Sequence, residues 1–498
     1  MTIYSINKSI GWSSSGVEYA QVYRAKVFRN LGVKFKFIFT DLITDNIGDL
    51  AENIGFRTNE IIWLYTYFTD FSISKSTFRL SEFQKSISGQ ILDTNREEKT
   101  IRYFMKDNTY AIAHLLDAKS DIIKSVDFGF ENKILKKDFY SYKKYMTEYY
   151  RYQNEKKIPV RRTFYNTNGT VAYFETLYNN GSSLYSFNGN IVMTKESLIS
   201  LMIKNLKLTR TDLVLIDRAT GIVQAVVENK NTAKLGCIIH AEHFNEQNTN
   251  DQHILWNNFY EYQLEHSDLF DFFITATDIQ KRIILNQLQN YKKVECKIYS
   301  IPVGTITHLK RNISRKNSFI TVSRLATEKH IDWLVSAFIK AHSFNSDITL
   351  DIYGEGAERK KIQKIIDENE AANFIKLKGH RNMLDIYQHY SAYVSASTSE
   401  GFGLTLMEAL GCGLAFIGFN VRYGNQNFIK NNKNGLLIKY SIQDPDDSSI
   451  LNLSQAINQI SATDLFGYSR FSYKLAQAYL EENVKNQWGK LLKKEHLL

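Results

Sequence analysis

The chain has 498 residues, of which 43% are hydrophobic and 23% are charged, and this composition indicates a globular protein of several domains. Its 31 Phe and 30 Tyr exclude wholesale disorder, and its 25 Gly show no repeat of the collagen kind. The three cysteines, Cys237, Cys296 and Cys412, lie far apart without a C-x-x-C motif, which favours a reduced protein over a disulfide scaffold.

A net charge of +10 favours anionic partners, namely phosphorylated ligands, acidic lipids or nucleic acid, and does not choose among them. No apolar run precedes Glu18, so the sequence predicts no signal peptide. The stretch that most resembles a membrane span, residues 403–421, contains four glycines, which suit a helix–turn–strand segment inside a core better than a bilayer. We therefore expect a cytoplasmic protein.

The first residues predict a strand, a loop and a helix. A short apolar run at 3–6 is followed by a loop of small residues at 11–16. Apolar residues then recur with helical spacing over 17–31, Gly32 suits a helix C-cap, and residues 36–40 return to a β pattern. This pattern is typical of a βαβ unit whose glycine-containing turn lies at the carboxyl end of the first strand.

Residues 65–194 interrupt the α/β pattern. Aromatic residues alternate there with polar ones, and Asn-Gly pairs occur at 168–169, 180–181 and 188–189. Asn-Gly between alternating runs is a strong hairpin signal, because type I′ turns require positive φ at both central residues. The sequence therefore predicts an antiparallel, β-rich insertion.

An alternation of strands and helices resumes after the insertion. The predicted strands are at 213–218, 235–240, 272–277, 297–304, 319–323, 348–354, 375–380, 392–397 and 414–419. The predicted helices are at 254–264, 278–288, 330–342 and 357–370, with one or two more in 469–492. A basic, polar stretch at 310–316 is expected to link two doubly wound halves.

We therefore predict an α/β fold with two Rossmann-like domains that face a cleft. The first domain comprises residues 1–64 and 195–308, the β-rich insertion comprises 65–194, and the second domain comprises 309–498. Ligands of open α/β sheets bind at the carboxyl ends of the strands, so two such edges can enclose a substrate.

Two cations follow one of the predicted strands. Arg324 and Lys329 come directly after the strand at 319–323 and precede a helix. At the carboxyl end of a strand, two fixed cations can bind a diphosphate and offset the charge that develops on a phosphate leaving group. A solvated helix start accounts equally well for the same two charges when they are considered alone.

The sequence SEGFGLTLMEA at 399–409 follows another predicted strand. Its glycines let the backbone approach a ligand, and a helix that begins near Leu404 directs N-terminal amides toward that ligand. Glu400 can accept hydrogen bonds from sugar hydroxyls and Glu408 from ribose hydroxyls. Without a ligand, Glu400 is an ordinary loop carboxylate and Glu408 is a charge favoured by the helix dipole.

The segments SRLATEKHIDWL (323–334), GEG (354–356) and EGFGLTLMEAL (400–410) resemble the C-terminal domain of retaining GT-B glycosyltransferases of the GT4-like group. Together with SIGWSSSGVEYAQVYRA (9–25) and HAEHF (240–244), they make the chain similar to the GtfA family. Members of this family are protein O-glycosyltransferase subunits that start the glycosylation of serine-rich repeat adhesins in Gram-positive bacteria. The resemblance covers most of the chain, and the insertion is its least motif-rich part.

The resemblance implies a role for each matching residue. The implied catalytic residues are Arg324, Lys329, Glu400 and His240. The implied UDP-binding residues are Gly16, Val17, Glu18, Tyr19, Arg324, Lys329, His380, Arg381 and Glu408. The implied donor-sugar contacts are His240, Glu400, Gly401, Phe402 and Gly403. No cofactor and no metal are expected, because the UDP-sugar is a co-substrate and the two cations hold its diphosphate.

Three features allow more than one interpretation. His240 and His243 can be metal ligands or an acid–base pair, but no further ligands accompany them, and a structural role stays open for His243. The D-x-D pattern at 444–446 predicts a solvated turn. Residues 133–162 combine ten Lys and Arg with six Tyr, which can bind single-stranded nucleic acid. No nucleic-acid signature accompanies them, so we expect a face for a partner subunit, an acceptor polypeptide or an anionic membrane.

The resemblance implies transfer of N-acetylglucosamine (GlcNAc) from UDP-GlcNAc to Ser or Thr hydroxyls of a serine-rich repeat adhesin, with retention of the anomeric configuration. It also implies a GtfB-type stabilising subunit, and we expect no nucleic-acid partner. UDP-glucose as donor, a polymer of the teichoic-acid type as acceptor, and a non-catalytic acceptor-binding subunit are the alternatives. Peripheral contact with the inner face of the cell membrane stays open.

Overall fold

The structure is a computed structural model, and it describes residues 1–12, 16–87, 89–106, 108–218 and 220–498. The chain divides into two compact units, and each is described by itself. Unit 1 comprises residues 1–25, 32–237 and Leu497, and unit 2 comprises residues 26–31, 238–496 and Leu498. None of the helices in the described ranges has the length and the apolar character that crossing a bilayer demands.

The chain begins with the expected βαβ unit. Strand β1 (Thr2–Asn7) pairs in parallel with β2 (Lys34–Phe39), and helix α1 (Gly16–Leu31) lies between them in sequence. Gly32 has a φ of 67°, as a glycine that ends a helix requires. The expectations for residues 3–40 are therefore confirmed, except that Ser13–Ser15 of the predicted loop lie outside the described residues.

The first parallel sheet has the strand order β19-β18-β15-β14-β1-β2-β3. Strand β15 carries residues of both units, since the boundary falls between Cys237 and Ile238. The remaining strands are β3 (Ile61–Trp63), β14 (Leu213–Ile216), β15 (Lys234–Ile239), β18 (Phe272–Thr275) and β19 (Ile298–Ser300). The helices of this part are α2 (Ile47–Ile54), α3 (Leu64–Tyr67), α5 (Lys195–Asn205), α6 (Val223–Asn229), α7 (Glu261–Glu265) and α8 (Asp278–Gln287). All residues of β14 and β18 are buried, which is typical of parallel strands covered on both faces.

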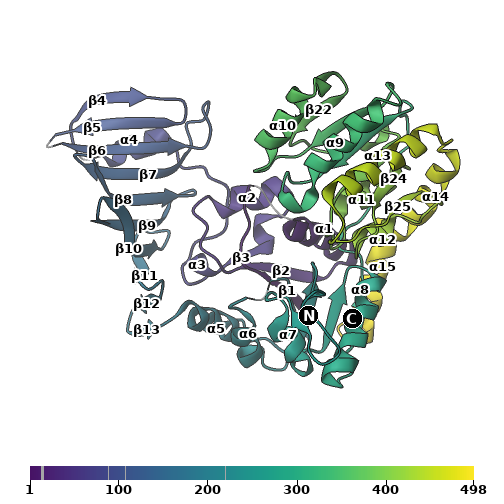
Figure 1. Ribbon diagram of the computed structural model, residues 1–498. Helices are drawn as coiled ribbons and strands as arrows, with labels where there is room; N and C mark the ends of the chain where they lie inside the picture. Colours follow the sequence, from purple (N-terminus) through teal and green to yellow (C-terminus); the bar gives the residue numbers. More distant parts are fainter. Residues whose placement is uncertain (13–15, 88, 107, 219) are drawn as a thin grey trace. The chain divides into compact units, whose positions relative to one another are not determined.

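Residues 91–192 form one antiparallel sheet of ten strands, in which each strand pairs with its neighbour in sequence (Figure 1). The strands are β4 (Ile91–Arg96), β5 (Thr100–Met105), β6 (Thr109–Leu115), β7 (Ile123–Phe130), β8 (Lys133–Tyr140), β9 (Lys144–Gln153), β10 (Lys156–Tyr165), β11 (Val171–Leu177), β12 (Ser183–Phe187) and β13 (Asn190–Val192). Helix α4 (Leu80–Ser86) covers part of one face, because its buried Phe83 packs with Ile101 and Tyr103. The expected β-rich character of the insertion is confirmed.

The Asn-Gly pairs form hairpin loops, but not by the expected turn type. Gly169 and Gly181 have φ values of 84° and 82°, whereas neither Asn168 nor Asn180 has a positive φ. In these two loops only the glycine is therefore left-handed, as in a type I turn followed by a G1 bulge and not as in a type I′ turn. In the first loop the Asn168 side chain accepts hydrogen bonds from the amide and the hydroxyl of Thr170, at 3.0 and 2.6 Å.

A column of stacked aromatic rings joins helix α3 to the antiparallel sheet. Tyr65 stacks on Phe164 with ring centroids 5.6 Å apart, and Phe164 stacks on Tyr173 at 4.5 Å. The Tyr173 hydroxyl also donates to the Tyr65 carbonyl oxygen at 2.6 Å. Within unit 1, these rings thus form a buried contact between the α/β part and the ten-stranded sheet.

The second parallel sheet has the order β22-β21-β20-β23-β24-β25. Its strands are β20 (Ser318–Val322), β21 (Thr349–Tyr353), β22 (Ile375–Gly379), β23 (Ala392–Ser395), β24 (Ala415–Phe419) and β25 (Gly435–Ile438). Its helices are α9 (Ile331–His342), α10 (Arg359–Glu368), α11 (Leu404–Leu410), α12 (Gly424–Phe428), α13 (Asp446–Ala462), α14 (Phe466–Ala476) and α15 (Glu481–Lys494). Apolar side chains of α9, α10 and α13 form one core with the strands.

A further sequence expectation was wrong in part. Within the helix predicted at 254–264, only the last residues are helical, in α7, while β17 (Leu255–Trp256) pairs with β16 (Phe244–Asn245) and is followed by a turn in which the Asn257 side chain accepts from the Phe259 amide. Such local bonds of Asn compete with a helix. The solvated turn expected at 444–446 is confirmed for Asp444 and Pro445, which are exposed and precede α13, while Asp446 begins that helix, where acidic side chains are favoured by the helix dipole.

Candidate active site

The sheet of unit 2 places two loops beside each other. Strand β20 pairs in parallel with β23, so the segments that follow these strands leave the same edge of the sheet. The Thr398 amide donates to the Glu328 carbonyl oxygen at 3.2 Å, and the buried Tyr393 hydroxyl donates to the Val322 carbonyl oxygen at 2.9 Å. The segment after β20 is therefore held against the segment after β23.

Lys329 and Glu400 meet where these two segments touch. The Lys329 Nζ atom lies 2.7 Å from Oε2 of Glu400, and both side chains are mostly covered. Arg324 lies at the same carboxyl end of β20, where its side chain is 70% exposed and pairs with Glu328 at 3.0 Å. The structure thus joins two of the predicted residues directly and leaves the third with most of its guanidinium in water.

Gly401 brings His240 to the same place. A Cβ atom at Gly401 would lie 2.4 Å from the His240 carbonyl oxygen, so only glycine fits at this contact. Both residues belong to unit 2. Gly403 follows with a φ of 87° and precedes α11, while Phe402 is buried. The segment 400–403 therefore contacts Lys329 through Glu400 and His240 through Gly401.

The other predicted residues of unit 2 lie further along the same sheet. His380 and Arg381 follow β22 and are exposed, and Arg381 donates to the Lys378 carbonyl oxygen at 3.3 Å. Glu408 lies in α11, where it accepts a hydrogen bond from the buried Tyr387 hydroxyl at 3.0 Å. These contacts place Glu408 on a helix that starts at the predicted site and leave His380 and Arg381 on an exposed loop.

His243 belongs to a buried polar network. Its Nε2 atom lies 2.7 Å from the Gln287 side-chain oxygen, and its Nδ1 atom lies 3.0 Å from the Tyr423 hydroxyl. Burial lowers the pKa of His243 to about 4, so the imidazole is neutral at pH 7. The Tyr423 hydroxyl also donates to Glu242 at 2.5 Å. Across the ranges that the structure describes, no three His, Cys, Asp or Glu side chains gather as metal ligands would.

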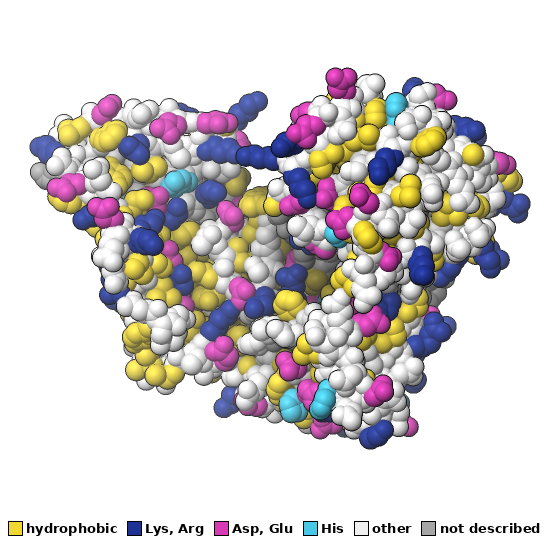
Figure 2. Space-filling model, viewed as in Figure 1, with side chains coloured by type: hydrophobic (Ala, Val, Ile, Leu, Met, Phe, Trp, Pro, Cys, Tyr) yellow, Lys and Arg dark blue, Asp and Glu magenta, His cyan; other side chains and the backbone are white. Residues whose placement is uncertain are grey.

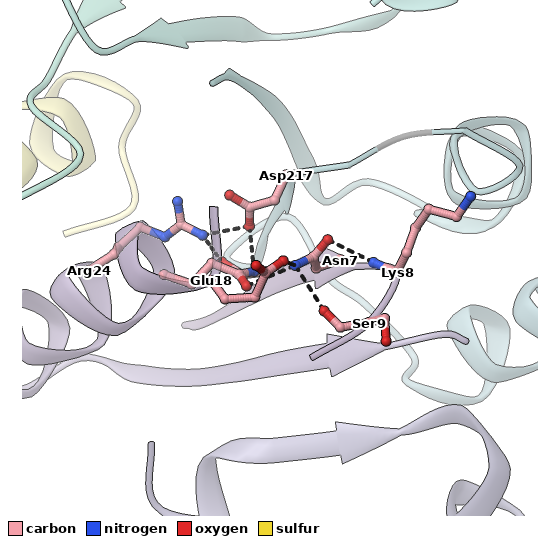
Figure 3. A network of polar contacts seen from close by, with 8 residues as sticks. Asn7, Lys8, Ser9, Glu18, Arg24 and Asp217 are labelled. Carbon is pink, nitrogen blue, oxygen red and sulfur yellow. Dashed lines mark hydrogen bonds and ion pairs between the residues drawn. The ribbon is translucent and has the colours of Figure 1, made fainter. Parts of the chain in front are cut away.

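The predicted residues of α1 lie in unit 1, in and beside a network of buried polar side chains (Figure 3). The Asn7 amide donates to Glu18 and to Gln21, both at 3.1 Å. Gln21 donates to Asp217 at 2.9 Å, and Arg24 forms a 2.5 Å ion pair with the same carboxylate oxygen. This network fixes the first turns of α1 to the carboxyl ends of β1 and β14.

The remaining residues of this group face outward to different degrees. Gly16 starts α1, and nothing lies within 4 Å of a Cβ atom built on it. Tyr19 is 36% exposed and Glu18 is 4% exposed, while Val17 is half-buried at the helix start. The start of α1 thus has both open space and a fixed carboxylate.

Sequence reasoning missed the residues that join the loops to one another. Tyr423 is completely buried, and it contacts both Glu242 and His243. The sequence around it is a short loop after the strand at 415–419 and carries no recognisable motif. Tyr393, which ties β20 to β23, was expected only as a strand residue. These roles depend on contacts between distant segments, which no local pattern encodes.

Two family models match the chain. The model described as "Glycosyl transferases group 1" matches residues 307–455, which include Arg324, Lys329, Glu400 and Glu408. The model described as "GtfA extended beta-sheet domain" matches residues 93–189, which lie within the ten-stranded sheet.

Whole-chain comparisons extend these matches. The UDP-N-acetylglucosamine–peptide N-acetylglucosaminyltransferase GtfA subunit of Streptococcus agalactiae is 44% identical, over 99% of this chain and 99% of its own. This chain belongs to the GtfA family. The fold also matches the crystal structure of the pneumococcal O-GlcNAc transferase GtfA in complex with UDP and GlcNAc, with a TM-score of 0.96, 41% identity and coverage of 100% and 99% of the two chains. A crystal structure of a GtfA/B complex matches with a TM-score of 0.92 and 44% identity over 99% of each chain.

These findings confirm two expectations from the sequence. The resemblance to the GtfA family is confirmed by the identity over nearly the whole of both chains. The GT-B class of glycosyltransferase fold is confirmed by the same structural relatives. The family models locate the glycosyltransferase match and the extended-sheet match in different parts of the chain.

Proposed function

We propose that this chain transfers GlcNAc from UDP-GlcNAc to Ser or Thr hydroxyls of a peptide; the name of its relatives describes the donor and a peptide acceptor. The observation that carries the proposal is the 44% identity over 99% of both chains with a peptide N-acetylglucosaminyltransferase subunit. The contact between Lys329 and Glu400 supports it, because residues of the kind needed to bind a sugar diphosphate lie together at the carboxyl edge of a parallel sheet.

Arg324 and Lys329 are proposed to bind the donor diphosphate. A guanidinium and an ammonium at this edge stabilise the negative charge that builds on UDP as the bond to the sugar breaks. The 70% exposure of Arg324 leaves its side chain accessible to a ligand. The acceptor hydroxyl attacks from the face that UDP leaves, and its proton passes to a phosphate oxygen, so the anomeric configuration is retained without a separate base.

The sugar and the nucleoside are assigned to the other residues that the family resemblance implies. Glu400 with Gly401–Gly403 and His240 contact the donor sugar, which the proximity of Gly401 to the His240 carbonyl supports. Glu408 binds the ribose. Gly16, Val17, Glu18 and Tyr19 approach the nucleotide, and His380 with Arg381 flank the uracil. A carboxylate held by buried partners, as Glu18 is, suits a directional hydrogen bond to a hydroxyl.

The ten-stranded sheet is proposed to bind the acceptor or a partner subunit. Lys and Arg side chains lie among hydrophobic ones on this sheet (Figure 2), including Lys136 over Phe128 at 4.4 Å and Arg161 over Phe174 at 3.7 Å. Such pairs offer both apolar area and donors to an extended polypeptide. We propose domains at residues 1–64 with 195–308, 65–194 and 309–498, and a GtfB-type partner, which the GtfA/B complex of a relative supports.

The test is a transfer assay with the full chain, alone and together with a GtfB-type subunit. A Ser/Thr-rich peptide from a serine-rich repeat adhesin is incubated with UDP-GlcNAc or UDP-glucose in parallel, and its mass is measured. We expect the mass of one N-acetylhexosamine to be added with UDP-GlcNAc. Addition of a hexose only would assign glucose as the donor. Peptide binding without transfer or donor hydrolysis would identify a non-catalytic subunit and overturn the proposal.

The location of the reaction follows from its donor. UDP-sugars are cytoplasmic metabolites, so we propose that the chain acts in the cytoplasm. Fractionation of cells that express a tagged chain, with and without its partner subunit, tests this. Recovery in the membrane fraction that high salt releases would indicate electrostatic contact with the membrane, because surface charges are screened by salt.

A further inference from the structure

One side chain connects the loop that carries His240 to the loop that carries Glu400. The Tyr423 amide donates to the Glu400 carbonyl oxygen at 2.7 Å, and the amide of Gly424 donates to the same oxygen at 2.9 Å. The hydroxyl of Tyr423 reaches the other loop, where it donates to Glu242 at 2.5 Å and lies 3.0 Å from Nδ1 of His243. All of these residues belong to unit 2.

The connection is buried on both sides. Tyr423 and His243 are each 0% exposed, and the ring centroids of the two side chains are 5.9 Å apart. Gln287 of α8 holds the far nitrogen of His243 at 2.7 Å. A buried phenol with a carboxylate and an imidazole partner has one favourable orientation, because any other would leave polar groups unpaired.

The neighbouring contacts between the loops are weaker. Arg422 pairs with Glu246 at 2.7 Å, but the Glu246 side chain is 72% exposed, and exposed ion pairs contribute little. Gly401 leaves room for the His240 carbonyl oxygen because it has no side chain. This close approach limits how near the two loops can come, but it does not hold them together. Arg422 also lies over the Phe244 ring at 4.9 Å, a contact that tolerates sliding. The buried hydrogen bonds of Tyr423 are thus the most directional of these contacts.

We propose that Tyr423 is a positioning residue for the glycosyl transfer, and that its hydroxyl, held by Glu242 and His243, sets the distance between His240 and Glu400. The inference rests on the proposed function, in which these two residues contact the donor sugar from opposite loops. Displacement of a reacting group by about 1 Å can cost roughly a hundredfold in rate. A hydroxyl that fixes two such groups therefore acts on turnover without touching the substrate.

The test compares Tyr423→Phe with Tyr390→Phe in the full chain. The Tyr390 hydroxyl also donates to a carboxylate, Asp351 at 2.6 Å, but lies outside both loops. Both variants lose a phenol hydroxyl and keep the ring. We expect Tyr423→Phe to lower kcat by about 10- to 100-fold, with the KM for UDP-GlcNAc and the affinity for UDP within about threefold, and Tyr390→Phe to keep the wild-type kcat.

A double-mutant cycle examines the same contact from the other loop. Glu242→Ala should lower kcat as Tyr423→Phe does, and the double variant should fall no further, since both changes remove one interaction. Glu242→Gln keeps an acceptor oxygen for the hydroxyl and should restore most of the rate. Additive losses, or equal losses for Glu242→Gln and Glu242→Ala, would contradict the positioning role.

Hydrogen exchange separates this inference from the proposed function. In Tyr423→Phe, the amides of residues 240–246 and 400–404 should exchange faster than in the wild type. In Tyr390→Phe, the same amides should exchange at the wild-type rate. If the wild type transfers sugar and Tyr423→Phe has the kcat of Tyr390→Phe, the inference is overturned and the function stands. If the wild type transfers no sugar, the proposed function is overturned. Unchanged amide exchange in both loops of Tyr423→Phe would also overturn the proposal that Tyr423 fixes these loops.

Discussion

Lys329 and Glu400 form an ion pair of 2.7 Å in which the two side chains are only 14% and 21% exposed. The pair joins the segment after β20 to the segment after β23, which are neighbouring strands of one sheet. In the proposed reaction this ammonium turns from the carboxylate to a phosphate oxygen of the donor. The contact therefore links the diphosphate site to the sugar site in the proposed reaction.

Replacement of Lys329 by Ala should lower turnover by about 10²- to 10³-fold, because a charge that stabilises the leaving group is lost. Arg324→Ala should have an effect of the same order. The matched control is Lys361→Ala, which removes a lysine that pairs with Asp332 away from these loops. Initial rates of peptide glycosylation measure the effect. Wild-type turnover in Lys329→Ala or Arg324→Ala would remove the proposed role of that residue.

Gly401→Ala should abolish transfer, because the added methyl group would lie 2.4 Å from the His240 carbonyl oxygen and force the loops apart. Gly467→Ala is the control, since nothing lies within 4 Å of its added Cβ in α14. In a helix that change should raise stability by up to about 1 kcal/mol. Transfer rates and thermal melts of both variants distinguish a local clash from general unfolding. Wild-type transfer by Gly401→Ala would show that the loops tolerate separation.

The sequence predicts what local periodicity and spacing encode. The strands around Arg324 and Glu400 are continuous apolar runs bounded by polar segments, so their ends, and with them the candidate residues, could be located from the pattern. The approach of Lys329 to Glu400 followed from the family motifs and from the rule that carboxyl ends share one edge.

The features that the sequence does not predict depend on contacts between distant segments. Nothing in the residues around Tyr423 indicates that its hydroxyl reaches Glu242, because the two lie 181 positions apart. The helix expected at 254–264 begins only at Glu261 for a related reason, since the amide of Asn257 bonds to the His243 carbonyl oxygen instead of continuing a helix. In both cases tertiary hydrogen bonds decided the local structure.

Acidification should destabilise the fold through His243. The pKa of this residue is lowered by burial to about 4, below its value in an unfolded chain of about 6.5, so the unfolded state binds the proton first. Its contribution to the free energy of unfolding is complete above about pH 6.5 and is lost as the pH falls toward 4, by up to roughly 1.4 kcal/mol per pH unit.

Urea titrations of the wild type and of His243→Gln between about pH 4 and pH 7 measure this contribution. Glutamine has no titrating ring, so the stability difference between the two proteins should shrink as the pH falls. Gln287, Tyr423 and Arg422 act on the imidazole, Glu242 accepts from Tyr423, and all four are present in both proteins. A constant difference across the range would mean that His243 does not titrate differently on folding.

Arg162 should be the most sensitive charge in the ten-stranded sheet. Its Nε atom lies 2.6 Å from Glu148 on β9, and its terminal nitrogen lies 2.9 Å from Glu175 on β11. The three side chains are 14%, 11% and 2% exposed, so Arg162→Met would leave two covered carboxylates without a cation. Removal of one partner from a buried ion pair costs about 3–5 kcal/mol.

The neighbouring Arg161 provides the control, because it points to the opposite face and lies over the Phe174 ring at 3.7 Å. Arg161→Met should cost only about 0.5–1 kcal/mol, as exposed cation–π contacts do. Hydrogen exchange of the amides of β9, β10 and β11 in the full chain measures both losses. Neutralising both acids together with the arginine, in Arg162→Met with Glu148→Gln and Glu175→Gln, should recover most of the stability, since no unpaired charge is then left between the strands.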